Sequence, residues 1–587
     1  MSPICLTRLR HSSCLGTVFS ALLLSLLVTG TGVTEGMTFL QFATPAFRDG
    51  LVQHDMLGDA GFRLHNTGFD DTPFGARWRD SELLQSAKET GKPYYMDRIM
   101  GGMPFQSLEG IEGIAAKLKD DPNFLGFQAH EWANSPTHDY HRIHQLILDK
   151  GLPFAAASFT ELEGSMARPY FSSGDFELFQ PIYRELKTQS DVEAYLTDYF
   201  KALVARTEGQ LVSVTGHGQV HHTALRLGAK NVMAEIGNQV PLTAFQIACA
   251  RGAGRQHGKP FGAYYEPWGG KPTGCICATD FSPWWPHEPK MKELMDGYNI
   301  GPQHGSSRSL QRRLLYYAWL SGAAWWSEEW GAENYFSNWE DYPLTTYGKI
   351  VQSFQQTTAS LAAPRPIVPV ALVMPRDTFG IDIRYMAGFT NTLWRIAPEG
   401  DAFHDQLRRF GKTFLATQRA GGGGDVHNLT PSPWIGCFDV FDDTVSDTLL
   451  ESYEAVVYFD ETRPRGADKG IYFDNSTESN EAIFSAMARR LPYTVDVSVG
   501  VAQAVSGDRV LVGVFNNLGV TKTTEGEQAD PKAFRIATVT GNTAGHEILL
   551  GKAFVTGTTD SELTINIPAG EVVLLSFPAN PSRLQSE

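Results

Sequence analysis

The densest set of side chains that could do chemistry lies in residues 124–134, FLGFQAHEWAN. A short apolar run there ends in His130, Glu131 and Trp132, and helical patterns precede and follow it. In (β/α)8 barrels, catalytic groups sit at the carboxyl ends of such strands. A glutamate beside a ring that could stack on a sugar face points to carbohydrate chemistry. The plainer alternative is a glutamate that caps the next helix.

Three other predicted strands carry acids near their ends. NVMAEIG contains Glu235, PFGAYYEPW contains Glu266, and AAWWSEEWG contains Glu328 and Glu329. Successive residues of a strand point to opposite sides, so at most one of Glu328 and Glu329 should face a pocket. Glu235 could instead cap the following helix, and Glu266 could order the Gly-Gly turn that follows it.

Further polar and aromatic residues lie at or just after predicted strand ends. We expect those that would contact a substrate to be His130, Trp132, Asn66, Asp97, His217, Trp268, Trp326 and Glu328. Tryptophan rings can bind the C–H faces of sugars, although tryptophans also fill protein cores. His217, His221 and His222 are close in sequence, but no acid lies at a recognised ligand spacing from them. We therefore expect neither a metal nor another cofactor.

The elements that must position these side chains alternate between strands and helices from residue 37 to about residue 362. This pattern predicts βα units around a parallel sheet, and its length favours a closed (β/α)8 barrel. The sequence contains nine strand-like runs, whereas such a barrel has eight strands. Counted forward, with PFAAASF (153–159) as the fifth strand, Glu235 lies on the seventh strand; counted back from the last run, Glu266 does. The sequence leaves the conflict open, with a slight preference for Glu235.

Two smaller domains are predicted after the barrel. Residues 363–494 begin with a proline-rich stretch and then combine buried strands with helices, which predicts a small flavodoxin-like or amidotransferase-like α/β domain. Residues 495–580 alternate apolar and polar side chains between turns, which predicts an antiparallel β-sandwich. The predicted fold class is therefore α/β, with a barrel, a small α/β domain and a terminal sandwich.

Composition and the amino terminus restrict the class of protein further. The chain of 587 residues has a net charge of −16, which argues against nucleic acid as a partner. Residues 1–32 combine basic residues with a short apolar run, as a secretory signal peptide does. We therefore expect a secreted or periplasmic protein with no membrane contact beyond this signal, or an uncleaved anchor in its place.

Two segments carry a resemblance to a known group of enzymes. KDDPNFLGFQAHEWAN (119–134) and LLYYAWLSGAAWWSEEWG (314–331), together with the order of domains, resemble the (β/α)8-barrel clan that includes the family 42 β-galactosidases. In that clan an acid/base glutamate lies on the fourth strand and a nucleophile on the seventh. The resemblance implies Glu131 as acid/base and either Glu235 or Glu266 as nucleophile. His130 stands where the clan usually has asparagine, a contact of the substrate 2-hydroxyl.

This resemblance implies a retaining hydrolase that cleaves O-glycosidic bonds of a carbohydrate by double displacement. The middle domain of the family 42 enzymes helps to form their trimer, so a homo-oligomer is a further expectation. The alternative from another class is a carbohydrate-binding protein whose barrel has lost its chemistry, because a fold does not by itself imply a function.

Overall fold

The computed structural model describes residues 36–579 with internal gaps. The gaps are at 43–44, 59, 65–71, 101–107, 134, 152–179, 183, 238–239, 241, 267–305, 330–334, 339, 377–401, 418–427, 460–468, 497, 524 and 552–553. The predicted signal peptide, Asn66, Trp268 and the run PFAAASF lie outside the described residues. Within the described part, no helix is both long and apolar enough to cross a bilayer.

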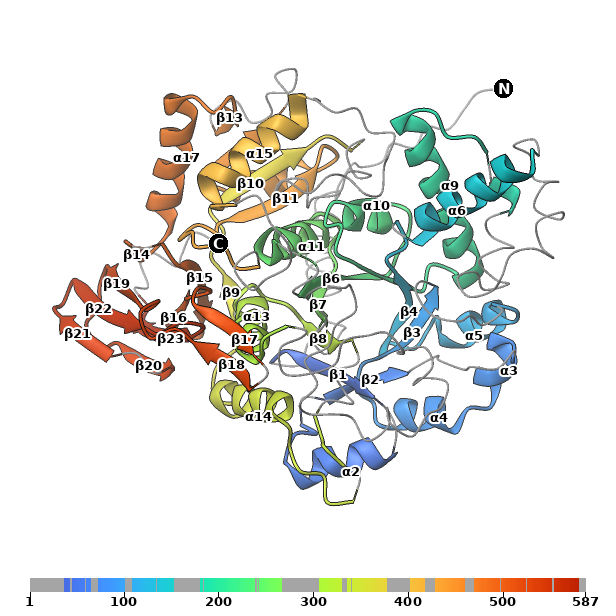
Figure 1. The fold of residues 1–587 in the computed structure, drawn as a ribbon, viewed down its shortest axis with the longest axis horizontal. Coiled ribbons are helices and arrows are strands. Elements are labelled where there is room, and N and C mark those ends of the chain that lie inside the picture. Colours follow the sequence, from blue (N-terminus) through green and yellow to red (C-terminus); the bar gives the residue numbers. More distant parts are fainter. Residues whose placement is uncertain are drawn as a thin grey trace, which may run out of the picture. The chain divides into compact units, whose positions relative to one another are not determined.

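Eight parallel strands close into a barrel, as the sequence predicts (Figure 1). Each strand pairs with the next, and the last pairs with the first, with Phe39 opposite Trp326. The strands are β1 (Thr38–Phe42), β2 (Ala60–Leu64), β3 (Tyr94–Met100), β4 (Phe124–His130), β5 (Leu211–Thr215), β6 (Asn231–Gly237), β7 (Phe261–Glu266) and β8 (Trp325–Glu328). All eight carboxyl ends therefore meet at one mouth of the barrel.

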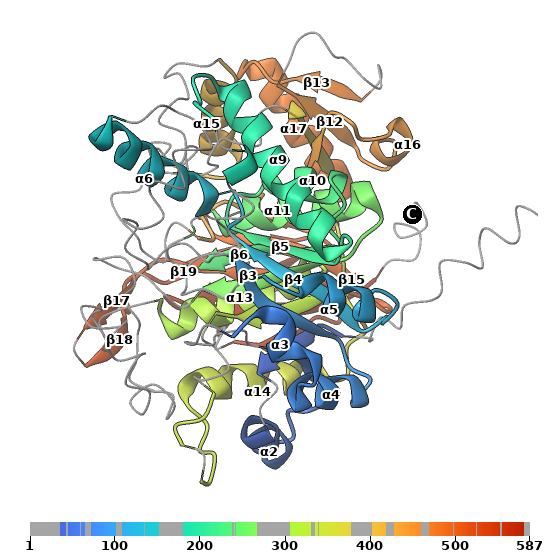
Figure 2. The ribbon, with the colours of Figure 1, turned by 90° about the vertical axis from the view of Figure 1, so that its right-hand side faces the viewer.

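Helices connect the barrel strands and surround them (Figure 2). They are α2 (Pro45–Gln53), α3 (Phe74–Arg79), α4 (Glu82–Glu89), α5 (Ile111–Leu118), α6 (Ser135–Lys150), α9 (Gln189–Thr207), α10 (Val220–Arg226), α11 (Thr243–His257), α13 (Arg308–Leu320) and α14 (Thr346–Thr358), with the short 3₁₀ helix η1 (Gln180–Ile182). Caps define where several of them begin: Thr188 and Asp191 form a capping box on α9, and Ser307 caps α13.

The pairing of β4 resolves the conflict over strand count. β4 pairs directly with β5, with Phe127 opposite Leu211, and β5 pairs with β6. Leu211–Thr215 is therefore the fifth strand of the barrel, next to β4. Glu235 lies on β6 and Glu266 on β7, so the forward count that placed Glu235 on the seventh strand is wrong. The apolar run 153–159 misled that count, because hydrophobicity alone does not identify a barrel strand.

The strands sort their side chains between two cores by alternation, which is interrupted between Leu125 and Phe127 of β4, where the pairing with β3 shifts register. Residues that face the barrel interior form one cluster: Leu40, Tyr95, Leu125, Val212, Val214, Met233, Tyr264 and Trp325. Their strand neighbours, such as Phe39, Phe127 and Tyr265, belong to the larger cluster that packs against the helices. This is the period of two that any strand imposes. The residues that continue the interior rows toward the carboxyl ends line the mouth.

The small α/β domain holds a parallel sheet in the order β11-β10-β12-β13. Its elements are β10 (Val370–Met374), α15 (Ala402–Phe414), β11 (Phe438–Asp442), α16 (Asp447–Leu450), β12 (Ala455–Tyr458), β13 (Gly470–Tyr472) and α17 (Thr477–Arg490). A phenylalanine cluster fixes α15 on the sheet: the Phe410 ring lies 5.1 Å from that of Phe438 and 5.4 Å from that of Phe473. The prediction of a second, smaller α/β unit is confirmed.

Two antiparallel sheets follow, ordered β14-β19-β22-β21 and β20-β23-β16-β15-β9, together with a separate ribbon, β17–β18. They contain β9 (Arg365–Pro366), β14 (Thr494–Val495), β15 (Gly500–Ser506), β16 (Arg509–Phe515), β17 (Val520–Thr523), β18 (Gly526–Ala529), β19 (Arg535–Thr540), β20 (Glu547–Leu550), β21 (Phe554–Thr558), β22 (Glu562–Ile567) and β23 (Val572–Pro578). The predicted antiparallel β-domain is therefore present. One of its strands, β9, comes from before the α/β domain in sequence and pairs with β15.

A buried ion network joins α11 of the barrel to β11. The carboxylate of Asp439 accepts from Arg251 Nε at 2.5 Å, from Arg255 Nη1 at 2.8 Å and from the Tyr453 hydroxyl at 2.5 Å. Burial works to raise the pKa of Asp439, but the two arginines outweigh it and hold that pKa below its ordinary value. Gly252 allows the close approach, because a Cβ there would lie 1.8 Å from the Val440 carbonyl oxygen.

We expect Asp439→Ala to destabilise the protein by about 3–5 kcal/mol, because it leaves the buried charge of Arg251 without its partner. Urea denaturation followed by tryptophan fluorescence measures the change. The control is Asp198→Ala, which removes the partly exposed pair between Arg184 and Asp198 at 3.0 Å and should cost less than about 1 kcal/mol. Equal losses in both variants would contradict a structural role for the Asp439 network.

Candidate active site

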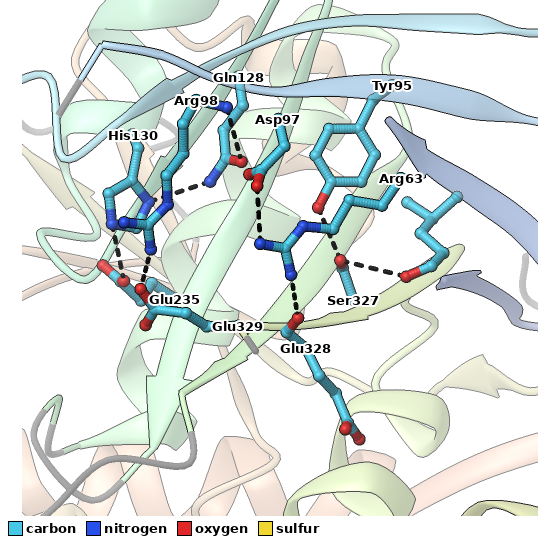
Figure 3. A network of polar contacts seen from close by, with 11 residues as sticks. Arg63, Tyr95, Asp97, Arg98, Gln128, His130, Glu235, Ser327, Glu328 and Glu329 are labelled. Atoms are coloured by element: carbon cyan, nitrogen blue, oxygen red, sulfur yellow. Dashed lines mark hydrogen bonds and ion pairs between the residues drawn. The ribbon is translucent and has the colours of Figure 1, made fainter. Parts of the chain in front are cut away.

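Charged and polar side chains from six barrel strands meet at the carboxyl-terminal mouth, and Figure 3 shows those of β2, β3, β4, β6 and β8. Most of them continue the interior rows of the strands, whereas Arg98 follows the interior residue Asp97 directly and has a left-handed backbone. The group consists of Arg63 on β2, Tyr95, Asp97 and Arg98 on β3, Gln128 and His130 on β4, Glu235 on β6, Tyr264 and Glu266 on β7, and Ser327 on β8, with Glu131 and Glu329 directly after β4 and β8.

One ion pair ties β2 to β3. Arg63 Nη2 donates to Asp97 Oδ2 at 2.7 Å, both side chains are buried, and Arg63 Nη1 donates to the backbone carbonyl of Glu328. Burial opposes the charge of Arg63, but Asp97 outweighs it and raises the pKa of the guanidinium. Nearby, the Tyr95 hydroxyl and Ser327 Oγ are 2.7 Å apart. The predicted site residue Asp97 thus lies in the mouth, where it neutralises an arginine.

A second ion pair joins Arg98 to Glu329. Arg98 has a left-handed backbone with φ of 44°, and its N–H donates to Gln128 Oε1 at 3.3 Å. A left-handed conformation is unfavourable for a residue with a side chain, and such strain concentrates at functional sites. In this conformation the backbone N–H of Arg98 contacts Gln128 on β4, while its guanidinium contacts Glu329 after β8.

The assignment of Glu328 to substrate binding needs correction. Its side chain points out of the barrel, where Oε1 accepts from Trp326 Nε1 at 2.8 Å and from Gln311 Nε2 at 2.7 Å (Figure 3). The next residue, Glu329, is the one that reaches the mouth. The prediction that at most one of this pair faces the pocket agrees with the structure, and the residue chosen was the wrong one.

Two of the predicted sugar platforms are packing residues. The Trp132 side chain is buried, donates from Nε1 to Ser213 Oγ at 3.0 Å and packs on Phe200 with ring centroids 4.2 Å apart. Trp326 is buried too and stacks on Tyr265 at 5.5 Å. Trp326 occupies an outward position of β8, and Trp132, two residues after the end of β4, packs against α9 through Phe200. Neither ring has a face that a substrate could reach.

Three carboxyl groups converge at the mouth. Glu131 directly follows β4 with a left-handed φ of 44°, and its N–H donates to the Val214 carbonyl at 2.8 Å. Glu235 and Glu266 are buried. Burial raises the pKa of Glu235 well above its ordinary value, and the nearby charges of Glu131 and Glu266 raise it further. All three predicted catalytic glutamates are therefore neighbours, and these surroundings disfavour a charge on Glu235.

His130 lies between β3 and the carboxyl group of Glu235. Its Nδ1 is 3.0 Å from Gln128 Nε2, and its Nε2 is 3.7 Å from Glu235 Oε1. Burial lowers the pKa of His130 to about 3, and the positive charge of Arg98 lowers it further. The imidazole is therefore neutral at any ordinary working pH, which makes it a hydrogen-bonding group instead of a charge.

Three histidines that are close in sequence, His217, His221 and His222, lie directly after β5. His217 is buried, and its N–H donates to Thr215 Oγ1 at 3.1 Å. His221 Nδ1 is 3.5 Å from Ser213 Oγ, and His222 Nε2 contacts the Val440 carbonyl at 2.8 Å. Among the residues that the structure describes, no three or more histidine, cysteine, aspartate or glutamate side chains form a group that could hold a metal ion.

Sequence reasoning missed four residues of the mouth: Arg63, Arg98, Gln128 and Glu329. Arg63 and Gln128 each stand inside an otherwise apolar strand, FRL and FLGFQAH. A polar residue at an interior position of a buried strand needs a partner. That signal could have identified Arg63 and Gln128, but only once it was known which residues of each strand face the barrel interior.

Comparisons with known proteins concern the fold. No protein-family model matches the sequence, and no curated protein matches it. A β-galactosidase from Bacillus circulans sp. alkalophilus is similar in structure, with a TM-score of 0.49, 10% identity and coverage of 93% of this chain and 99% of that one. A catalytic mutant of Gan42B, a GH42 β-galactosidase from G. stearothermophilus, has a TM-score of 0.43 and 9% identity, with coverage of 93% of this chain and 98% of that one. Alpha-L-fucosidase isoenzyme 2 from Paenibacillus thiaminolyticus has a TM-score of 0.40 and 10% identity, with coverage of 93% of this chain and 100% of that one.

These structural neighbours are glycoside hydrolases. With TM-scores below 0.5 and identities of about a tenth, the likeness to them assigns no activity to this chain. The function is therefore argued from the side chains at its own barrel mouth.

The outward position of Glu328 has a consequence for stability. Burial raises the pKa of Glu328 from 4.5 to about 7, although hydrogen bonds from Trp326 and Gln311 act to lower it. The folded protein thus keeps a proton that the unfolded chain releases above about pH 4.5. The contribution of Glu328 to stability therefore falls as the pH rises from about 4.5 to about 7, and is constant above that.

We expect Glu328→Gln to remove this dependence, because the amide oxygen can keep both hydrogen bonds without a charge. Relative to the unmodified protein, the variant should gain stability between pH 5 and pH 8, approaching roughly 3 kcal/mol. Thermal melts at several pH values measure the gain, with Glu340→Gln on the exposed surface as the control. A difference in melting temperature that stays the same at pH 5 and pH 8 would contradict the buried, protonated state.

Proposed function

We propose that the chain is a retaining glycoside hydrolase that cleaves O-glycosidic bonds of a carbohydrate through a covalent glycosyl-enzyme intermediate. The observation that carries the proposal is the convergence of Glu131, Glu235 and Glu266 at the carboxyl-terminal mouth, close enough for two of them to raise the pKa of the third. Retaining glycosidases need two neighbouring carboxyl groups, one that donates a proton and one that attacks the sugar. Barrel enzymes place such groups at this mouth.

Glu131 is the proposed acid/base. It lies at the end of β4, and its side chain is only partly buried, so a leaving-group oxygen can approach it. Its left-handed backbone turns it back toward the mouth directly after the strand. The resemblance to the family 42 clan assigns the same role to the fourth strand.

Glu266 is the proposed nucleophile. A nucleophilic carboxylate must be ionised, and the raised pKa of Glu235 disfavours that residue for the role. Glu266 also lies on the seventh strand, where the clan has its nucleophile. This reverses the slight preference for Glu235 that the strand count of the sequence had produced. Glu235 then acts as a neutral acid that donates a hydrogen bond beside the two reacting groups.

Alanine variants of the three glutamates test these roles on a panel of nitrophenyl glycosides. Glu266→Ala should lower kcat by several orders of magnitude on every substrate, because no covalent intermediate can form. Glu131→Ala should lower it by roughly 10²–10⁴-fold where the leaving group is poor, and far less on activated aryl glycosides. Glu235→Gln keeps a neutral hydrogen-bond donor and should retain the most activity of the three variants.

Added azide separates the two catalytic roles. With Glu131→Ala, azide should restore turnover of activated substrates and give a glycosyl azide of retained configuration. With Glu266→Ala, the glycosyl azide should have inverted configuration, because azide then attacks the substrate directly. Near-normal turnover of both Glu131→Ala and Glu266→Ala would refute the two-carboxylate mechanism. Binding of sugars without hydrolysis by the unmodified protein would favour a carbohydrate-binding protein instead.

A further inference from the structure

The Gln128 side chain connects the backbone of β3 to the imidazole of His130 (Figure 3). Its Oε1 accepts from the backbone N–H of Arg98 at 3.3 Å, and its Nε2 is 3.0 Å from His130 Nδ1. A backbone N–H can only donate, so the amide oxygen must face Arg98. The amide nitrogen, which can only donate, must then face His130. The orientation of the amide is thus determined by a group whose chemistry is unambiguous.

This orientation determines the tautomer of His130. A donor at Nδ1 requires that Nδ1 accept, and a neutral imidazole then carries its hydrogen on Nε2. His130 Nε2 faces Glu235 Oε1 at 3.7 Å, so Nε2–H is directed at that oxygen. An oxygen that receives a donor is the poorer place for a second proton. The proton of Glu235 therefore belongs on Oε2, which is buried and has no hydrogen-bond partner among the described residues.

The surroundings keep His130 neutral. Charged and titratable groups face it from the strands around it: Arg63 on β2, Asp97 and Arg98 on β3, Glu131 directly after its own strand, Glu235 on β6, and Tyr264 on β7 at 5.7 Å between rings. Burial is the largest influence and lowers the pKa of His130 to about 3, with Arg98 next. Glu131 and Asp97 act in the opposite direction without outweighing them. His130 can therefore serve as a fixed donor over the whole neutral range.

We propose that Gln128 is a positioning residue that locks His130 in the Nε2–H tautomer, so that the Nε2–H of His130 points at Glu235 Oε1 and the proton of Glu235 lies on Oε2. The catalytic meaning of this lock rests on the proposed glycosidase function. With its proton on Oε2, Glu235 offers a single oriented donor beside Glu131 and Glu266.

The test combines a spectroscopic readout with kinetics on the full chain. Histidine labelled with ¹⁵N at the ring reports which nitrogen carries hydrogen, and His130→Gln assigns the signal. In the unmodified protein we expect a protonated Nε2 and an unprotonated Nδ1 throughout pH 5–8. Gln128→Leu should lose this single tautomer. Gln128→Glu should protonate both nitrogens, because the new carboxylate stabilises the imidazolium.

The kinetic arm follows the same variants. Gln128→Glu should lower kcat by roughly tenfold or more with little change in KM, and should shift the alkaline limb of the pH profile to lower pH. The shift has this sign because a charged imidazole lowers the pKa of Glu235, which then ionises earlier. Gln355→Leu is the matched control: it removes another buried glutamine, which donates to the Met56 carbonyl at 3.3 Å, and should leave both readouts unchanged.

The outcomes test the fixed tautomer of His130 separately from the proposed glycosidase function. A protonated Nδ1 in the unmodified protein, or the same tautomer in Gln128→Leu, overturns the lock whatever the activity. If Gln128→Leu does not fold, an imidazole signal in Gln128→Glu that matches the unmodified protein overturns it equally. A locked tautomer that is lost in Gln128→Leu, in a protein that hydrolyses no glycoside, supports the lock and refutes only the glycosidase function.

Discussion

The closed parallel barrel is the constraint on which the site depends. Because each strand alternates its side chains, every second residue faces an interior that narrows to an apolar cluster around Leu40, Met233 and Trp325. The rows continue to the carboxyl ends, where charged residues replace apolar ones. Closure between β1 and β8 makes these ends adjacent although they are far apart in sequence. A single-residue shift in any strand would exchange its interior row for its exterior row, as the contrast between Glu328 and Glu329 illustrates.

Placing so many charges in a buried mouth is costly unless each finds a partner. Two ion pairs meet this need: Arg63 with Asp97, between the neighbouring strands β2 and β3, and Arg98 with Glu329, which joins β3 to the end of the more distant β8. Glu235 is buried instead among other carboxyl groups, and burial together with the charges of Glu131 and Glu266 raises its pKa. The mouth therefore holds carboxyl groups in different electrostatic surroundings, a difference that acid/base chemistry at one site uses.

The small α/β domain and the antiparallel β-domain both contact helices of the barrel. Helix α11, which follows β6, is fixed through Arg251 to the buried Asp439 of the α/β domain. Helix α13, which leads into β8, is tied to the sandwich by Arg313, whose Nε donates to Asn517 Oδ1 at 2.7 Å. Both contacts involve helices adjacent to strands that bear site residues. The smaller domains thus stabilise the position of those strands without contributing a side chain to the described mouth.

Much of the architecture follows from the sequence alone. Alternating apolar runs and amphipathic helices predict the barrel, and a change to period two predicts the antiparallel domain, because both patterns are local. The convergence of Glu131, Glu235 and Glu266 was also expected, since each acid ends a buried run. Local pattern was sufficient wherever the relevant period lies within one element.

Only the tertiary structure decided which strand is which and which side chains point inward. Hydrophobicity could not show which apolar run forms the fifth strand, because strand identity is set by pairing with distant segments. Nor could it show that Trp326 packs outward, since the side of the sheet that a residue faces depends on the register of its strand with the neighbouring strands. Arg63 pairs with Asp97 on β3, and Gln128 accepts a hydrogen bond from the backbone of Arg98 on β3. Both contacts join two different strands, so they form only once the barrel strands are paired.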